Sequence, residues 1–179
     1  MRLSRLTIEG VWLVEPELHA DERGFFARTW CAREAAEAGI SASFVQASVS
    51  FNEVGGTLRG MHYQAAPHEE AKLVRCTAGS IYDVVADLRP TSPTYLKWHG
   101  EELSAANRRA LYIPEGCAHG FITMEDGSEV LYDISSFYEP DSARGVRWND
   151  PTLAIRWPRQ PARISTRDAA YPLLRDGTP

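Results

Sequence analysis

Short hydrophobic runs recur along the chain and are separated by glycine, proline and asparagine. The runs are rich in valine, isoleucine, tyrosine, phenylalanine and tryptophan, which are residues that favour β-strands. Many short strands at this spacing are typical of an antiparallel sandwich or barrel. The pattern predicts strands at residues 10–14, 25–30, 44–50, 57–63, 72–77, 80–88, 96–103, 110–113, 120–124 and 129–136.

Two segments depart from this strand pattern. Alanine and glutamate dominate residues 32–38 before a glycine, which predicts one short helix near the N-terminus. From Pro140 onward, proline, arginine, aspartate and tryptophan dominate, which predicts an irregular C-terminal extension. We expect this extension to wrap around the sheets, because Trp148, Ile155 and Trp157 need apolar surroundings. The predicted fold is an all-β jelly-roll sandwich or barrel, with residues 1–179 as a single domain.

Charge and composition argue against several classes of protein. The net charge is −5 with acidic and basic residues interspersed, so the chain lacks the basic field of a nucleic-acid-binding protein. No apolar run approaches the ~20 residues of a membrane span, and the N-terminus lacks the apolar segment of a signal peptide. We therefore expect a cytoplasmic protein. Cys31, Cys76 and Cys117 are too widely spaced for a disulfide framework or a zinc ribbon.

Three long polar side chains are expected inside the barrel. Alternate residues of a strand share a face, and on this rule His62, Tyr132 and Lys72 each lie among small or apolar neighbours. The three sets are Leu58, Gly60, His62 and Gln64; Val130, Tyr132 and Ile134; and Lys72, Val74 and Cys76. One inward histidine or tyrosine is usually a core residue, but three such polar groups are costly without partners or a ligand. Together they predict a ligand cavity in the mouth of the barrel.

A family resemblance rests on the segment at residues 56–64, GTLRGMHYQ. This segment resembles the signature of the dTDP-4-dehydrorhamnose 3,5-epimerases. The resemblance continues, in the family's order, at residues 21–26, 44–46, 72–75, 82–89, 92–94, 113–121, 131–132, 138, 145–148, 150–151, 155–158 and 165–168. It covers roughly residues 5–172, so it is far more specific than one short motif.

This resemblance implies a cupin-like jelly-roll homodimer that uses no metal and no cofactor. In such enzymes His62 is the general base, Asp168 orients it, Tyr132 is the acid on the opposite face, and Lys72 lies near the ketone oxygen of the sugar. The substrate is a nucleotide-linked 4-keto-6-deoxyhexose, which is epimerised at C3, C5 or both. The implied substrate contacts are Arg23, Phe26, Arg28, Gln46, Ser48, Arg59, His119, Tyr138 and Arg167, with Arg23 and Phe26 supplied by the partner subunit.

The residue types suit this chemistry. The C4 ketone acidifies the hydrogens at C3 and C5, and inversion requires proton removal on one face and proton return on the other. A histidine, with an ordinary pKa of about 6.5, suits the base, and a tyrosine, at about 10, suits the acid. Lysine stabilises charge on the ketone oxygen, as donors in an oxyanion hole do. Arginine forks suit a diphosphate.

Three departures from the family pattern concern recognition of the nucleobase. Many members have glutamate at the position of Arg28, asparagine at Ser48 and an acidic residue at Ala143, all near the nucleotide base and ribose. We expect the catalytic residues His62, Asp168, Tyr132 and Lys72 to be intact. The nucleobase that the chain prefers is left open.

Alternative interpretations remain at this stage. A metal-dependent cupin, either a dioxygenase or a sugar isomerase, would use His62, His119 and Glu69 or Glu70; the second histidine of its usual pair is absent. A non-catalytic sugar-binding module would not require the acid and base together. A ketoisomerase or a single-carbon epimerase could share the same residues. Asp168, three residues after Ser165, could also serve only as part of a capping box.

Overall fold

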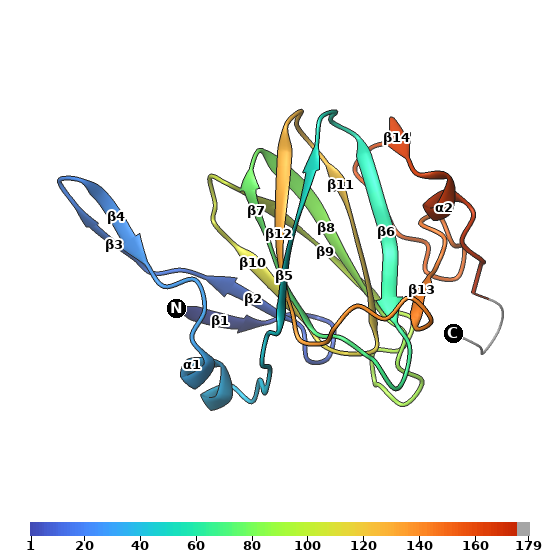
Figure 1. Cartoon of the computed structure of the whole chain (residues 1–179), viewed down its shortest axis with the longest axis horizontal. Coiled ribbons are helices and arrows are strands. Elements are labelled where there is room, and N and C mark those ends of the chain that lie inside the picture. The colour runs from blue at the N-terminus through green and yellow to red at the C-terminus, as the bar shows by residue number, and fades with distance from the viewer. Residues whose placement is uncertain (175–179) are drawn as a thin grey trace.

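Two antiparallel sheets face each other in the computed structural model, which describes residues 1–174 (Figure 1). The first sheet has the order β1 (Arg2–Arg5), β2 (Trp12–Glu15), β10 (Ala110–Ile113), β7 (Lys72–Ala78), β12 (Ser128–Ile134) and β5 (Gln46–Asn52). The second has the order β13 (Ala143–Gly145), β6 (Thr57–Gln64), β11 (Cys117–Thr123), β8 (Ser80–Asp87) and β9 (Trp98–Ser104), and β14 (Arg163–Ile164) runs parallel to β6. The predicted all-β jelly-roll sandwich is confirmed.

All ten predicted strands are present, with ends that shift by a few residues. The strand predicted at residues 120–124 begins earlier, at Cys117, so it includes His119. The strand predicted at 25–30 is the shorter β4 (Gly24–Ala27), which pairs with β3 (Leu18–Asp21) in a separate hairpin. The pattern missed β1, β3, β13 and β14. These strands are short or exposed, so they lack the alternation of apolar residues that predicts a strand. β3, for example, is exposed at all four positions.

The main core lies between the two sheets. Alternation along each strand directs apolar residues inward from both sides, such as Val74 and Leu111 from the first sheet and Val85 and Phe121 from the second. Cys76 and Cys117 are buried in the same core as free thiols. Near one end of this core, polar residues replace apolar ones on the same inward faces, and this is where the cavity forms.

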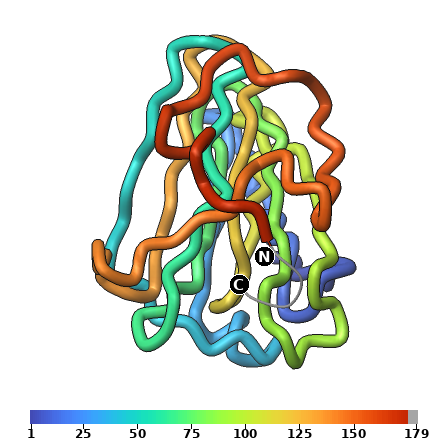
Figure 2. The backbone as a smooth tube through the Cα atoms, turned by 90° about the vertical axis from the view of Figure 1, so that its right-hand side faces the viewer, coloured from blue at the N-terminus to red at the C-terminus, as the bar shows by residue number. Residues whose placement is uncertain are grey.

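Each outer face of the sandwich has its own cover. Helix α1 (Ala32–Glu37) is the predicted short helix, and its Ala35 packs with Leu73 and Tyr112 on the outer face of the first sheet. The C-terminal extension crosses the second sheet (Figure 2). Ile155 and Trp157 pack there against the cluster that contains Met61 and Val84, as expected for a wrapped extension. Within residues 1–174, no helix has the length and apolar character needed to span a membrane.

A β-bulge in β6 corrects the predicted alternation. Register partners are His119 with His62 and Phe121 with Arg59, so β6 has two residues between these pairs where β11 has one. The extra residue reverses the face to which the next side chains of β6 point. Arg59 and His62 therefore line the same cavity although they are three positions apart. Gly60 is needed here, because its φ is 119° and a Cβ would lie 2.6 Å from Cα of Gly120.

Candidate active site

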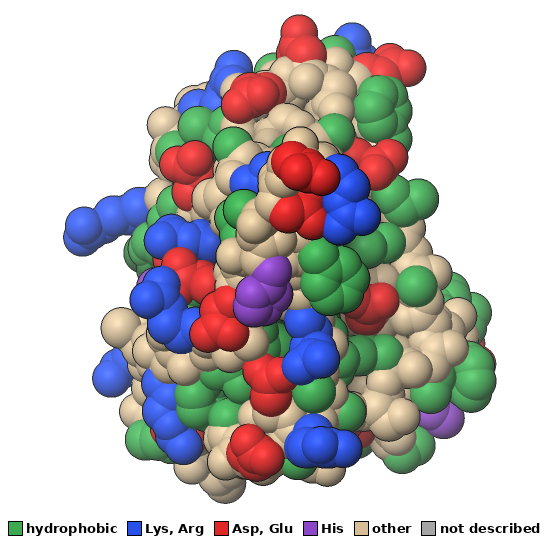
Figure 3. Space-filling view, turned by 90° about the vertical axis from the view of Figure 1, so that its left-hand side faces the viewer, with side chains coloured by type: hydrophobic (Ala, Val, Ile, Leu, Met, Phe, Trp, Pro, Cys, Tyr) green, Lys and Arg blue, Asp and Glu red, His purple; other side chains and the backbone are tan. Residues whose placement is uncertain are grey.

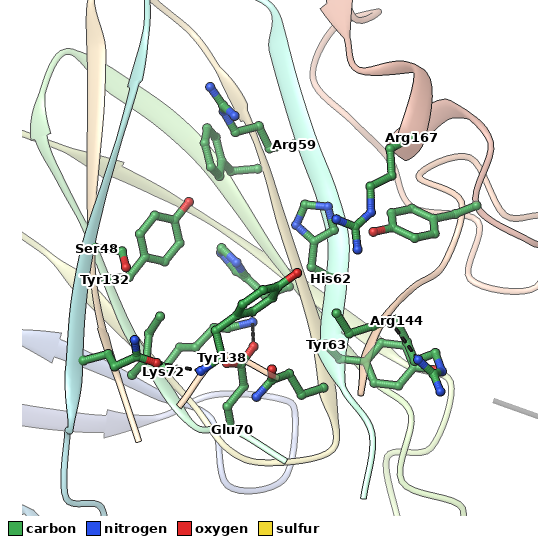
Figure 4. A pocket seen from close by; sticks show the side chains of 17 residues that line it. Ser48, Arg59, His62, Tyr63, Glu70, Lys72, Tyr132, Tyr138, Arg144 and Arg167 are labelled. Atoms are coloured by element: carbon green, nitrogen blue, oxygen red, sulfur yellow. Dashed lines mark hydrogen bonds and ion pairs between the residues drawn. The ribbon is translucent and has the colours of Figure 1, made fainter. Parts of the chain in front are cut away.

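A cavity of about 370 Å³ opens between the sheets at the polar end of the core (Figure 4). This volume is in the range of small-molecule sites. Both sheets contribute side chains, and the C-terminal extension closes one side. The lining residues are Gln46, Ser48, Arg59, His62, Tyr63, Gln64, Glu70, Lys72, His119, Phe121, Tyr132, Ile134, Tyr138, Ala143, Arg144, Arg167 and Tyr171.

His62 and Asp168 form a hydrogen-bonded pair at the wall formed by the second sheet. Nε2 of His62 lies 2.8 Å from Oδ1 of Asp168, and the amide of Gly60 in the bulge donates to Oδ2 at 3.1 Å. Because the carboxylate accepts from Nε2–H, the lone pair of a neutral imidazole is on Nδ1. Burial raises the pKa of Asp168, but the hydrogen bonds from His62 and Gly60 outweigh burial and leave it below its usual value. The hydrogen bond to Asp168 therefore fixes the tautomer of His62, and its neutral imidazole can act as a base through Nδ1.

Asp168 also begins helix α2 (Thr166–Ala169). Its amide donates to Oγ of the N-cap residue Ser165 at 3.0 Å. The capping interpretation is therefore correct for the backbone of Asp168, while its carboxylate is free to bind His62. The cap fixes where the short helix begins, and this holds the carboxylate next to the imidazole of His62.

Tyr132 projects into the cavity from the opposite sheet. It lies on β12, where Ser48 of β5 is its cross-strand neighbour. In Figure 4, Tyr132 and His62 point toward one another from the two walls. Tyr132 packs against the main core, and burial raises the pKa of its phenol. The phenol therefore keeps its proton at neutral pH, as a proton donor must.

One ion pair and one histidine–carboxylate hydrogen bond, both largely buried, lie next to these groups. Nζ of Lys72 is 2.8 Å from Oε1 of Glu70, and both side chains are almost buried. Nε2 of His119 is 2.7 Å from Oδ1 of Asp83, and burial raises the pKa of Asp83. The ring of His119 packs edge-on to that of Tyr132, with centroids 5.9 Å apart. Asp83 thus fixes the ring that supports the phenol.

Three arginines give the opening a local positive charge in an acidic chain. They are Arg59 from β6, Arg144 from β13 and Arg167 from α2. Arg59 is held by the buried Asn52, whose Oδ1 accepts from Nε at 2.7 Å. Gln46 accepts from the amide of Tyr138 at 2.7 Å and so holds that aromatic residue at the rim. These groups can contact an anionic ligand with an aromatic part.

Three predicted substrate contacts lie outside this cavity. Arg23 and Phe26 lie on the β3–β4 hairpin, which projects from the body of the chain, and Arg28 directly follows it. Arg23 pairs with Asp21, and Arg28 pairs with Glu34 at 2.8 Å. Figure 3 shows the molecule from the hairpin side, where acidic and basic side chains are interspersed. A single chain does not bring these three residues to its own cavity, so their substrate contacts stay predictions.

The arrangement does not favour the metal-dependent interpretation. In the part of the chain that the structure describes, no three histidine, cysteine or acidic side chains converge as a metal site requires. His62 and His119 are each paired with a carboxylate, and Glu70 is paired with Lys72.

The sequence assigned no role to two residues of the site, Asp83 behind His119 and Tyr171 in the cavity lining. Asp83 had a signal: it alternates with Ile81 and Val85 on a strand face that is otherwise apolar, and an acidic residue there needs an explanation. Tyr171 had none, because it follows a short helix in an irregular segment. Its place beside His62 depends on how the extension folds back.

Comparisons with known proteins agree with this geometry. A family model described as dTDP-4-dehydrorhamnose 3,5-epimerase matches residues 5–176. The enzyme of that name from Shigella flexneri is 42% identical over 169 residues, which cover 94% of this chain and 93% of the relative. The enzyme of that name from Pseudomonas aeruginosa is 45% identical over 165 residues, covering 92% and 90%.

Solved structures give the same result. The Bacillus anthracis enzyme of the same name, crystallised with TDP and PPi bound, matches with a TM-score of 0.93 and 40% identity, covering 97% of this chain and 99% of that chain. The likeness thus extends over nearly the whole chain in both sequence and fold. The chain belongs to the dTDP-4-dehydrorhamnose 3,5-epimerase family.

Proposed function

We propose that the chain epimerises a nucleotide-linked 4-keto-6-deoxyhexose at C3, C5 or both. The observation that carries this proposal is the pairing of His62 with Asp168 on one wall of a cavity whose opposite wall presents the protonated phenol of Tyr132. A base and an acid on opposite walls can take a proton from one face of a carbon and return one to the other face.

The reaction needs no oxidant and no co-reactant. The lone pair on Nδ1 of His62 takes the proton from the carbon next to the ketone, and the electrons of the C–H bond move onto the ketone oxygen. The ammonium of Lys72 stabilises the enolate that results. The carbon then takes a proton from the phenol of Tyr132 on its other face, and the configuration inverts. Proton exchange with water returns His62 and Tyr132 to their starting states.

The relatives support a thymidine diphosphate sugar as the substrate. The Bacillus anthracis structure has TDP and PPi bound, and a Legionella pneumophila relative at 37% identity was solved with dTDP-4-keto-L-rhamnose. Arg59, Arg144 and Arg167 at the opening suit a diphosphate. The nucleobase preference of this chain can differ from that of its relatives, because Ser48 and Ala143 line this cavity where many members carry asparagine and an acidic residue.

Family membership alone does not choose between one inverted carbon and two. A dTDP-4-dehydrorhamnose 3-epimerase from Streptomyces niveus is 42% identical over 177 residues, as similar as the 3,5-epimerase from Shigella flexneri. The test is proton NMR of the substrate dTDP-4-keto-6-deoxyglucose incubated with the protein in deuterated water. We expect deuterium to enter at C3, at C5 or at both. A substrate that retains both hydrogens contradicts the proposed function.

Replacing Lys72 by methionine is expected to slow this exchange. Methionine keeps much of the volume of the lysine stem but removes the charge that stabilises the enolate, so the rate should fall about 10²- to 10³-fold, as for loss of an oxyanion-hole donor. The rate is measured by the same NMR exchange. Lys97→Met is the matched control, because Lys97 is the other lysine of the chain and is exposed outside the cavity. Equal rates for the two variants would contradict the role of Lys72.

The proposal includes a homodimer that completes the site. The β3–β4 hairpin exposes 74% of Phe26 and 46% of Phe25, and β5, an edge strand of the first sheet, exposes Val49 and Phe51. Exposed apolar residues beside an open sheet edge favour a second copy of the chain. In such a dimer, Arg23 and Phe26 would reach the partner's cavity. Sedimentation of the purified chain tests this, and a monomer with full turnover contradicts it.

A further inference from the structure

We propose that the ring of Tyr171 is a positioning device for His62, and that Gly145 is a glycine because this ring occupies the space of a side chain there. The proposal rests on the proposed function, in which His62 is the base. Tyr171 acts through His62 and does not itself exchange a proton with the substrate.

The first observation is the space opposite His62 on the neighbouring strand. β13 pairs with β6 so that Gly145 is the register partner of His62. A Cβ on Gly145 would overlap Cε2 and Cζ of Tyr171 and would lie 2.6 Å from its Cδ2. The backbone of Gly145 is outside the left-handed region, so its conformation does not require glycine. The ring of Tyr171 therefore fills the place of the missing side chain.

The second observation is the contact between the two rings. Tyr171 packs edge-on to His62, with ring centroids 5.7 Å apart and planes at 72°. This is a favoured arrangement for aromatic pairs. The hydrogen bond to Asp168 fixes only Nε2 and leaves the imidazole free to tilt about that point. A ring packed on its side removes this freedom and covers part of a side chain that is still 41% exposed.

The third observation is that the segment after α2 is anchored. Nε of Arg147 donates to the carbonyl of Tyr171 at 2.8 Å, and the amide of Arg147 donates to the carbonyl of Pro172 at 3.1 Å. The amide of Leu174 donates to Oδ2 of the buried Asp150 at 2.6 Å. The backbone of Tyr171 is thus held from the segment that follows β13, which also supplies Gly145. One anchored segment therefore controls two contacts of the same imidazole, the carboxylate and the ring.

The test compares Tyr171→Ala, which removes the ring, with Tyr171→Phe, which keeps it. Each variant is assayed by deuterium exchange into dTDP-4-keto-6-deoxyglucose, with kcat and KM measured separately, and by NMR titration of the His62 imidazole. We expect kcat to fall about 10- to 100-fold for Tyr171→Ala, because small displacements of a reacting group are costly, with KM nearly unchanged. Tyr171→Phe should keep the wild-type rate and titration curve. Leu173→Ala, in the same segment with an exposed side chain, is the matched control.

A second pair of variants tests the role of Gly145. Gly145→Ala should push the ring away from His62 and lower kcat as Tyr171→Ala does. In the Tyr171→Ala background, Gly145→Ala should cost nothing further, because the clash is gone. Additive losses, or a Tyr171→Phe variant as slow as Tyr171→Ala, would overturn the proposal. Absence of exchange in the wild-type chain would instead reject the proposed function. In that case the NMR titration of His62 tests the role of Tyr171. A titration curve that is the same in Tyr171→Ala as in the wild-type chain would reject the positioning role of Tyr171.

Discussion

Replacing His62 by asparagine is expected to abolish measurable deuterium exchange at both carbons next to the ketone, while the nucleotide sugar still binds. General bases contribute about 10²- to 10⁴-fold to rate, and the cavity offers no second histidine of the same kind, because His119 is buried with Asp83 behind it. Asparagine can still donate to Asp168, so the carboxylate is not left without a partner. The measurement is single-turnover exchange by NMR together with calorimetric titration of dTDP.

A matched histidine variant shows whether the effect is local. His68 is exposed and lies outside the cavity lining, so His68→Asn should exchange at the wild-type rate. The acid side of the pH profile gives a further check. The pKa of Asp168 is below its usual value, so this carboxylate stays ionised as the pH falls from neutral toward its ordinary range near 4. Loss of rate in that interval must therefore come from another group. Exchange that persists in His62→Asn would refute the base assignment.

Replacing Tyr132 by phenylalanine is expected to separate exchange from inversion. Without the phenol, His62 can still remove the proton and return one to the same face, so deuterium should enter within about tenfold of the wild-type rate. Inversion should fall by about 10² or more, because no acid remains on the opposite wall. Proton NMR of the sugar measures both events, since exchange removes a signal and inversion changes the coupling pattern.

The control for this variant is Tyr95→Phe, a phenol removed outside the cavity lining. Because burial raises the pKa of Tyr132, its phenol remains protonated as the pH rises through the ordinary tyrosine range near 10. A fall in the wild-type rate at high pH should therefore not come from deprotonation of Tyr132. Inversion at the wild-type rate in Tyr132→Phe would remove Tyr132 from the mechanism.

These experiments separate the chemical groups from the groups that hold them. His62 and Tyr132 would exchange protons with the substrate, and Lys72 would stabilise charge. Asp168 and Tyr171 would instead fix one imidazole from two directions. Such positioning residues are expected to change kcat more than KM, because they alter alignment and not the contacts that bind the nucleotide.

The sequence by itself determined the sandwich and the inward faces of three polar residues. Strand periodicity is local: Lys72 shares a face with Val74 and Cys76, and Tyr132 shares one with Val130, whatever the strands later pair with. The family resemblance added Asp168 as the partner of His62, and the structure brings these two residues together across 106 positions of sequence. Local pattern and motif were sufficient because each strand face and each motif lies within a few neighbouring residues, even where two motifs meet only in the folded chain.

Only the tertiary structure decided the rest. The bulge in β6 depends on its register with β11, and it places Arg59 beside His62 against simple alternation. Tyr171 lies beside His62 because Arg147 holds the C-terminal segment in place and Gly145 leaves room for the ring. Contacts of this kind join residues far apart in sequence, and strand register and side-chain packing set them. No short stretch of sequence contains that information.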